Sequence, residues 1–242
     1  MQKRVYKIAE NRLVAADTYE LRLSGRGTVD GEFIHLEIPG FFLRRPFSVC
    51  DKFKGGLSLL YKVVGEGTRV LSTLPKGTPV SILTGLGKGF SASSCRENAL
   101  LVGGGLGAAP LYLLAKELKA QEKQVSVVLG FNKADEIVLR KEFEALCDHV
   151  TITTMDGSVG IRGFVTDALK ASLLNYDFFY TCGPMVMMKG VCSLLSGHGE
   201  ASLEERMGCG AGFCYGCTIK TTRGPRRVCK DGPVFKKEEI VW

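Results

Sequence analysis

The chain contains 242 residues, of which 45% are hydrophobic and 24% charged, as is typical of a soluble globular protein with one large or two ordinary domains. No apolar run approaches the ~20 residues that a transmembrane helix requires, so we expect no membrane association. The formal charge of +7 is spread along the chain without a helix-turn-helix or RNP-like pattern, so we expect no nucleic-acid partner either.

The first segment, residues 1–95, predicts an antiparallel β-barrel. Short runs rich in β-branched and aromatic residues alternate with Gly, Pro or Asp, and six of them follow one another at close spacing. The predicted strands are Val5–Ile8, Tyr19–Leu23, Phe33–Ile38, Arg45–Val49, Leu57–Val64 and Pro79–Leu83.

Two polar groups interrupt the apolar strands of this barrel. The first is Arg45-Pro46-Phe47-Ser48; the second begins at Leu60-Tyr61-Lys62 and ends at Gly65-Glu66-Gly67-Thr68. Arginine has a planar fork that matches phosphate oxygens, and Ser48 and Tyr61 add hydroxyl groups. The Gly-x-Gly-Thr turn opens a predicted helix, Thr68–Leu74, whose first amides can approach an anion. Each residue alone is an ordinary strand or turn residue, and the order of the two groups carries the signal.

The second segment, residues 96–200, predicts a parallel sheet with crossover helices. Strand-like and helix-like runs alternate from Asn98 onward, which is the pattern of a Rossmann-like α/β domain. The predicted strands are Ala99–Val102, Val125–Leu129, Val150–Thr154 and Phe178–Thr181, and the predicted helices are Ala108–Ala120, Lys141–Cys147, Thr166–Ala171 and Met185–Leu195.

Two turns of this segment lie where a doubly wound fold binds a dinucleotide. A glycine-rich turn follows the first strand, at the pyrophosphate position, and contains Gly103, Gly104, Gly105 and Gly107. Cys182-Gly183-Pro184 ends the last predicted strand, on the nicotinamide side. Either turn also fits a plain strand-to-helix connection. No acidic residue directly follows Val125–Leu129, where an acidic side chain commonly binds the ribose of NAD.

The third segment, residues 201–242, contains four cysteines in the spacing C-x4-C-x2-C-x11-C, namely Cys209, Cys214, Cys217 and Cys229. This is the plant-type spacing of a [2Fe–2S] cluster. The intervening glycines let the backbone curl and direct amide groups toward sulfur. A zinc site would normally pair its ligands on two short arms, and nine cysteines is an odd number for a disulfide framework.

The cysteine usage also indicates a compartment. No charged-then-apolar leader precedes Val5, so we expect a reducing, cytoplasmic location. The five remaining cysteines have apolar neighbours and are interpreted as small buried hydrophobic residues: Cys50, Cys95, Cys147, Cys182 and Cys192. The three histidines, including His35, are isolated in the sequence and receive no role.

Together the motifs resemble the ferredoxin–NADP reductase superfamily, and the whole chain resembles the electron-transfer subunits of type B, NAD-dependent dihydroorotate dehydrogenase. The resemblance implies an FAD-binding barrel at 1–95, an NAD-binding α/β domain at 96–200 and a [2Fe–2S] subdomain at 201–242. It assigns FAD to Arg45, Pro46, Phe47, Ser48, Leu60, Tyr61, Lys62, Gly67 and Thr68, NAD to Gly103, Gly104, Gly105, Gly107, Cys182, Gly183 and Pro184, and the cluster to the four cysteines.

The same resemblance implies a partner and a route for electrons. The partner is a catalytic subunit that holds FMN and oxidises dihydroorotate in pyrimidine biosynthesis, in a heterotetramer of two copies of each subunit. Electrons then pass from FMN through the cluster and FAD to NAD. Two other readings stay open at this stage: a flavin and iron–sulfur subunit of a hydrogenase, sulfide dehydrogenase or transhydrogenase, and a zinc-binding interaction module without redox function.

Overall fold

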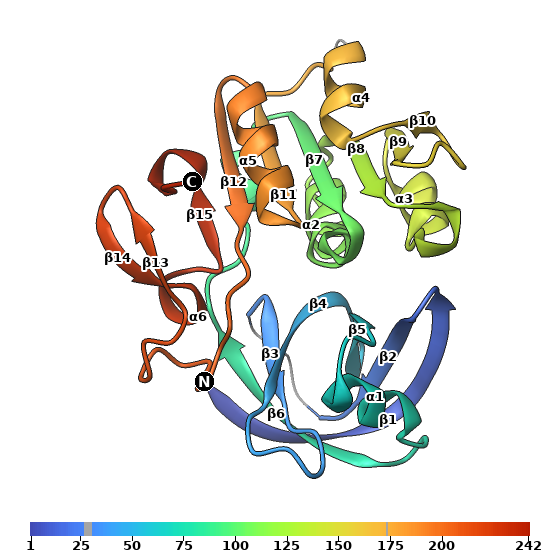
Figure 1. Ribbon diagram of the computed structural model, residues 1–242, viewed down its shortest axis with the longest axis vertical. Coiled ribbons are helices and arrows are strands. Elements are labelled where there is room, and N and C mark those ends of the chain that lie inside the picture. The colour runs from blue at the N-terminus through green and yellow to red at the C-terminus, as the bar shows by residue number, and fades with distance from the viewer. Residues whose placement is uncertain (27–30, 173) are drawn as a thin grey trace. The chain divides into compact units, whose positions relative to one another are not determined.

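The computed structural model describes residues 1–26, 31–172 and 174–242. The chain forms two compact units, which we call the barrel unit (Met1–Gly89 with Glu204–Pro233) and the sheet unit (Phe90–Leu203 with Val234–Trp242). Figure 1 shows the elements of each unit. Within the described ranges, no helix is both long and apolar enough to cross a membrane.

The first part of the barrel unit is a closed antiparallel barrel, as predicted. Each of the six predicted strands forms, and the strands hydrogen-bond in the order β1-β2-β5-β4-β3-β6, with β6 returning to β1. They are β1 (Gln2–Ala15), β2 (Thr18–Ser24), β3 (Phe33–Leu36), β4 (Arg45–Phe53), β5 (Gly56–Lys62) and β6 (Pro79–Leu86).

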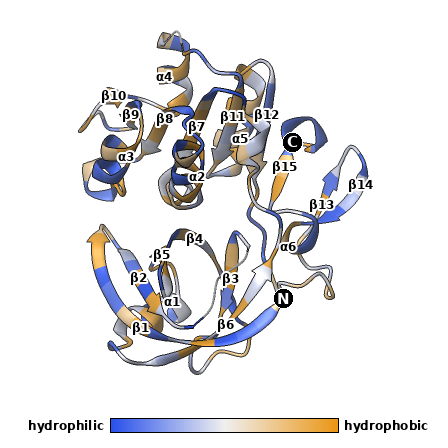
Figure 2. Cartoon of the chain, turned by 180° about the vertical axis from the view of Figure 1, so that it is seen from behind, coloured by the Kyte–Doolittle hydropathy of each residue, from blue (hydrophilic) through white to orange (hydrophobic). Residues whose placement is uncertain are grey.

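The barrel closes around side chains that alternate along its strands. On β1, Tyr6 and Ile8 are buried whereas Val5 is exposed. Figure 2 shows hydrophilic and hydrophobic stretches alternating along this strand. On β5, Leu57 and Leu59 are fully buried, and their neighbours Ser58 and Leu60 on the other face are buried as well. A period of two places every second side chain on one face of a strand, so the barrel interior is a conventional apolar core.

Helix α1 (Glu66–Thr73) follows β5 and begins two residues before the predicted start. The hydroxyl of Thr68 accepts hydrogen bonds from the backbone N–H groups of Val64 (3.0 Å) and Gly65 (3.2 Å). These bonds hold the turn before the helix, in the manner of a capping box, so Gly65 is the N-cap residue.

The sheet unit contains a seven-stranded sheet in the order β10-β9-β8-β7-β11-β12-β15. Neighbouring strands are parallel except β12 and β15, which pair antiparallel. The strands are β7 (Asn98–Gly104), β8 (Gln124–Phe131), β9 (His149–Thr154), β10 (Ile161–Arg162), β11 (Phe178–Cys182), β12 (His198–Ser202) and β15 (Val234–Lys236), and the helices are α2 (Ala108–Ala120), α3 (Arg140–Leu146), α4 (Val165–Ala171) and α5 (Met185–Leu194).

Helices cover both faces of this sheet. A Cβ at Gly103 would meet Leu111 of α2, whereas a Cβ at its neighbour Gly104 would meet Met187 of α5. Because successive residues of a strand face opposite ways, α2 and α5 lie on opposite faces. The core on the α4–α5 face contains Leu100, Val102, Val128, Val165, Ala168, Leu169, Phe179 and Val191.

Strands β12 and β15 extend the sheet beyond the predicted elements. The stretch His198-Gly-Glu lacks an apolar pattern, yet Glu200 is only 7% exposed and its carboxylate accepts the Ser91 N–H at 3.1 Å. Burial raises the pKa of this carboxyl group. Residues 234–242, predicted as part of the cysteine segment, associate with the sheet unit through β15. The assignment of one cofactor to each of the three predicted segments stays a prediction.

The cysteine segment lies within the barrel unit up to Pro233. Its regular elements are β13 (Thr218–Thr221), β14 (Gly224–Arg227) and the short helix α6 (Val228–Asp231). β13 and β14 form an antiparallel hairpin. The hydroxyl of Thr221 donates to the carbonyl of Gly224 at 2.6 Å and closes its turn.

Candidate cofactor sites

The structure brings the two polar motifs of the barrel together. The side chain of Arg45 on β4 lies beside Gly67 in the first turn of α1, where a Cβ would stand 3.6 Å from Arg45 Nε. One guanidinium nitrogen donates to the carbonyl of Leu43 at 2.6 Å. A guanidinium next to the amides of a helix N-terminus is an arrangement suited to phosphate groups.

The other residues of these motifs lie on the adjacent strands β4 and β5. Phe47 meets Tyr61 edge-on, with ring centroids 5.9 Å apart. Tyr61 is 1% exposed and its hydroxyl donates to Asn11 Oδ1 at 2.9 Å, so this hydroxyl is engaged inside the barrel. Burial raises the pKa of Tyr61. Pro46 and Ser48 on β4 are half-buried, and Leu60 and Lys62 lie on the face of β5 opposite to Tyr61.

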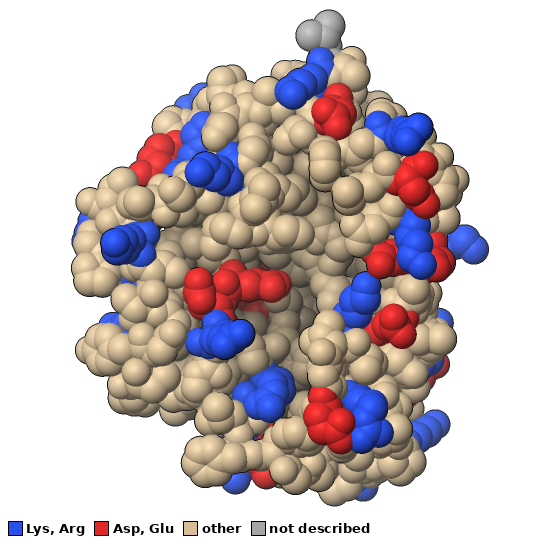
Figure 3. Space-filling view, viewed as in Figure 1, with Lys and Arg blue, Asp and Glu red and all other residues tan. Residues whose placement is uncertain are grey.

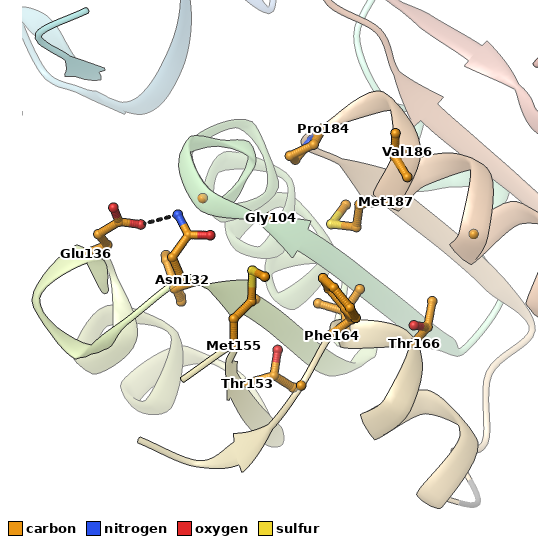
Figure 4. Close-up of a pocket in the computed structure, with 16 residues that line it drawn as sticks. Gly104, Asn132, Glu136, Thr153, Met155, Phe164, Thr166, Pro184, Val186 and Met187 are labelled. Carbon is orange, nitrogen blue, oxygen red and sulfur yellow. Dashed lines mark hydrogen bonds between the residues drawn. The ribbon is translucent and has the colours of Figure 1, made fainter. Parts of the chain in front are cut away.

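A pocket of about 400 Å³ lies in the sheet unit at the carboxyl ends of its parallel strands. Figure 4 shows Asn132 and Glu136 at one end and Pro184, Val186 and Met187 at the other, with Gly104 between them. This edge is where open α/β sheets bind ligands. The lining residues are Gly104, Gly105, Gly130, Phe131, Asn132, Glu136, Thr153, Met155, Gly163, Phe164, Val165, Thr166, Pro184, Val186, Met187 and Gly190.

Three of the predicted nucleotide residues line this pocket directly: Gly104, Gly105 and Pro184. Gly107, Cys182 and Gly183 make backbone contacts beside it, whereas Gly103 faces Leu111 of α2. A Cβ at Gly107 would overlap the backbone carbonyl of Cys182, and a Cβ at Gly183 would lie 2.9 Å from the Gly104 nitrogen. The glycine-rich turn and the Cys-Gly-Pro turn therefore pack backbone against backbone, which requires glycine at the contact.

Sequence analysis missed the acidic residue of this pocket. Glu136 lines it and accepts a hydrogen bond from Asn132 Nδ2 at 2.7 Å. The residue ends a 3₁₀ turn, η3 (Ala134–Glu136), which follows β8. Sequence analysis considered only the positions directly after the strand, but an acid a few residues further on in a turn-rich stretch was a usable signal.

The loop of the first three cysteines surrounds one sulfur with backbone donors. Cys209 Sγ accepts from the N–H groups of Ala211 (3.4 Å), Phe213 (3.2 Å) and Cys214 (3.4 Å). Burial alone would raise the pKa of the Cys209 thiol, but these donors outweigh it and lower the pKa to about 6. A thiolate is the form that binds metal, so the loop stabilises Cys209 in its metal-binding form.

The four cysteines form two neighbouring pairs. Cys209 hydrogen-bonds with Cys214, whereas the backbone N–H of Cys229 donates to Cys217 Sγ at 3.4 Å. Burial, and then the neighbouring Cys217, raise the pKa of Cys229 to about 12. Each iron of a [2Fe–2S] cluster takes two protein ligands, so two thiol pairs fit such a cluster. Among the described side chains, no three His, Cys, Asp or Glu converge as ligands of a single metal ion would.

Of the five other cysteines, Cys50, Cys95 and Cys182 are buried, as expected, whereas Cys147 and Cys192 are only half-buried. Burial raises the pKa of Cys147 to about 12 and that of Cys192 to about 11. Both remain thiols at neutral pH, and neither lies in the cysteine loop.

The surface near the cluster loop is partly apolar. Phe213 is 78% exposed, and Tyr215 is 64% exposed with the guanidinium of Arg227 4.8 Å from its ring centroid. On the face visible in Figure 3, basic and acidic side chains are interspersed. Phe213 and Tyr215 thus present exposed aromatic rings on either side of Cys214 in the sequence.

Comparisons with known proteins place the chain in a family. Residues 204–241 match the model of the iron–sulfur cluster binding domain of dihydroorotate dehydrogenase B, and residues 101–193 match that of the oxidoreductase NAD-binding domain. A dihydroorotate dehydrogenase B (NAD(+)) electron transfer subunit from Fusobacterium nucleatum is 36% identical, with 96% of each chain covered. One from Bacillus caldolyticus is 39% identical, covering 97% of this chain and 96% of its own. The chain belongs to this family of electron transfer subunits.

Solved structures agree with this fold. A chain from an NADH-dependent reduced ferredoxin-NADP oxidoreductase superimposes with a TM-score of 0.88 at 29% identity, covering 98% of this chain and 90% of its own. Phthalate dioxygenase reductase shares the fold with a TM-score of 0.67 at 18% identity, over 79% of this chain and 64% of its own. This chain thus shares its fold, a barrel followed by a parallel-sheet domain, with these reductases.

Proposed function

We propose that the chain is the electron-transfer subunit through which a dihydroorotate dehydrogenase catalytic subunit reduces NAD⁺, in support of orotate formation for pyrimidine biosynthesis. Family membership over nearly the whole chain carries this proposal. The two cysteine pairs are suited to an iron–sulfur cluster, and the pocket of the sheet unit is suited to a dinucleotide, so both support this proposal. The chain is an oxidoreductase whose cofactors are a [2Fe–2S] cluster, FAD and NAD.

The need for three cofactors follows from counting electrons. A [2Fe–2S] cluster passes one electron at a time, NAD⁺ takes two as a hydride, and a flavin exchanges electrons either way. The protein's part is to bind and orient these groups. Arg45 and the N-terminus of α1, beside Gly67, would hold the phosphates of FAD, and Cys209, Cys214, Cys217 and Cys229 would hold the cluster.

The pocket of the sheet unit would bind the dinucleotide. The turns at Gly104 and Pro184 would approach the pyrophosphate and the nicotinamide side. Glu136 would accept hydrogen bonds from the 2′- and 3′-hydroxyls of the adenosine ribose, and its carboxylate would repel the 2′-phosphate of NADP. Lys133, the nearby cation, is paired with Asp135 at 2.8 Å, which supports a preference for NAD.

The partner would be an FMN-containing catalytic subunit, joined in a cytoplasmic heterotetramer of two copies of each chain. Electrons enter at the cluster, so the docking face would include the exposed Cys214 with Phe213 and Tyr215 beside it. Exposed aromatic side chains are the usual anchors of protein interfaces.

A related function has an observation in its favour. The similarity to the NADH-dependent reduced ferredoxin-NADP oxidoreductase extends over 98% of this chain at 29% identity. A chain of this fold and cofactor set would serve another electron donor equally well. The substrate that the assembled complex oxidises therefore distinguishes the proposed function from this related one.

Two measurements test the proposed function. Anaerobically purified chain should contain one FAD, two irons and two sulfides, and the complex with its partner should form NADH when dihydroorotate is added. Cys214→Ser should abolish this reaction yet preserve NADH oxidation by artificial dyes, whereas Cys147→Ser, a change of a half-buried cysteine outside the loop, should affect neither. A complex that carries all cofactors and ignores dihydroorotate would overturn the proposal in favour of another donor.

A further inference from the structure

His35 is a buried histidine of the barrel unit that the proposed function does not use. It lies on β3 and is 1% exposed. Across the residues that the structure describes, neither Nδ1 nor Nε2 of its ring has a hydrogen-bond partner. Buried polar side chains in proteins are almost always hydrogen-bonded, so an unpaired imidazole points to a partner outside the polypeptide.

The ring lies against the cysteine loop. A Cβ at Gly210 would stand 2.7 Å from both Cε1 and Nδ1 of His35, so only glycine permits this contact. Gly210 also has a φ of +67°, in the left-handed region. Because Gly210 directly follows the ligand Cys209, the imidazole packs against the part of the loop that holds the first thiol pair.

The same strand connects His35 to the flavin motif. In the β3–β4 register His35 is paired with Pro46, the second residue of Arg45-Pro46-Phe47-Ser48. Phe33, two residues before His35, meets its ring edge-on at a centroid distance of 6.1 Å. The imidazole thus lies between the ring of Phe33 on β3 and Gly210 of the cysteine loop.

The charge state of the ring follows from its surroundings. Burial, and then the charges of Arg44 and Arg45, lower the pKa of His35 to about 4. The imidazole is therefore neutral near pH 7 and carries one N–H donor and one acceptor nitrogen. Metal-bound thiolates and sulfides accept hydrogen bonds but do not donate them, so they match the N–H group of this ring.

We infer that His35 donates its ring N–H to a sulfur of the iron–sulfur cluster and thereby raises the reduction potential of the cluster. This inference rests on the proposed function, since it requires the cluster. Reduction adds negative charge to the cluster, and a hydrogen bond to sulfur stabilises that charge. His35 is a positioning and tuning residue here, because the thiolates alone hold the iron.

The test compares three variants of the intact chain. His35→Leu removes the donor, His35→Gln keeps an N–H donor, and Phe33→Leu alters the packing beside the ring without touching a donor. With iron and flavin content equal to wild type, His35→Leu should lower the midpoint potential, measured by redox titration with electron paramagnetic resonance. We expect about a tenfold change in the equilibrium constant for reduction, which is about 59 mV for a one-electron couple. His35→Gln and Phe33→Leu should stay near wild type.

A second measurement needs no variant. In wild-type protein labelled with ¹⁵N at histidine only, pulsed electron paramagnetic resonance of the reduced cluster should detect one coupled histidine nitrogen. Absence of this coupling, or an unchanged potential in His35→Leu, would overturn the role of His35. A wild-type chain purified without iron would instead overturn the proposed function itself.

Discussion

Replacing Glu136 by glutamine should shift the coenzyme preference of the chain from NAD toward NADP. Glu136 lines the pocket of the sheet unit and is bonded to Asn132 Nδ2 at 2.7 Å (Figure 4). Glutamine has nearly the same shape and keeps one oxygen acceptor, so the pocket should retain its form. What changes is the negative charge beside the proposed ribose position.

The size of the shift can be worked from this charge. A hydrogen bond to a charged acceptor contributes about 1 kcal/mol more than one to a neutral acceptor, so NAD should bind ~5-fold more weakly. Two unit charges about 4 Å apart interact by about 1 kcal/mol in water and about 4 kcal/mol at an effective dielectric constant of ~20. For a half-buried carboxylate and a 2′-phosphate we take ~1–2 kcal/mol, so NADP should gain ~5–30-fold. The preference should therefore change by ~30–150-fold.

The assay is dye reduction by NADH and NADPH, with kcat/KM determined for each coenzyme in wild type and variant. Glu142→Gln is the control, because it removes one acidic charge from an exposed residue of α3 that does not line the pocket. A ratio that stays within about threefold of wild type in Glu136→Gln would refute the ribose contact. An equal shift in both variants would mean that the local field, rather than a direct contact, sets the preference.

Arg45→Ala should weaken FAD binding by ~10–150-fold, since a charge-assisted phosphate contact contributes ~1.5–3 kcal/mol, and fluorescence titration of flavin-free protein checks this. Gly107→Ala should abolish dinucleotide binding and lower the urea midpoint, because its Cβ would overlap the Cys182 carbonyl; unchanged binding and stability would contradict the packing argument. The pKa of His35 is lowered from 6.5 to about 4 by burial and then by two arginines. Between these two pH values the unfolded chain therefore binds a proton that the native chain does not. The free energy of unfolding of the cofactor-free protein should fall by about 3 kcal/mol as the pH falls from 6.5 to 4. This decrease should be missing in His35→Leu.

Local patterns were sufficient for most of the regular elements. The barrel strands and the helix Ala108–Ala120 formed where their periodicities and turn residues predicted them, because each of these segments carries its own apolar face. Strand β12 (His198–Ser202) has no such face in its sequence. It forms because β11 and β15 provide hydrogen-bonding edges on either side, which is information held by other parts of the chain.

The sequence alone determined the chemistry that the chain can support. The spacing from Cys209 to Cys229 and the order of the two barrel motifs depend only on residues near one another in the chain, and so they were readable without a structure. The tertiary structure decided which distant residues complete each site. His35 meets Gly210 because the barrel register and the path of the cysteine loop coincide there, and Glu136 lines the pocket from the 3₁₀ turn that follows β8. Contacts of this kind arise from the packing of whole elements, and no local pattern records them.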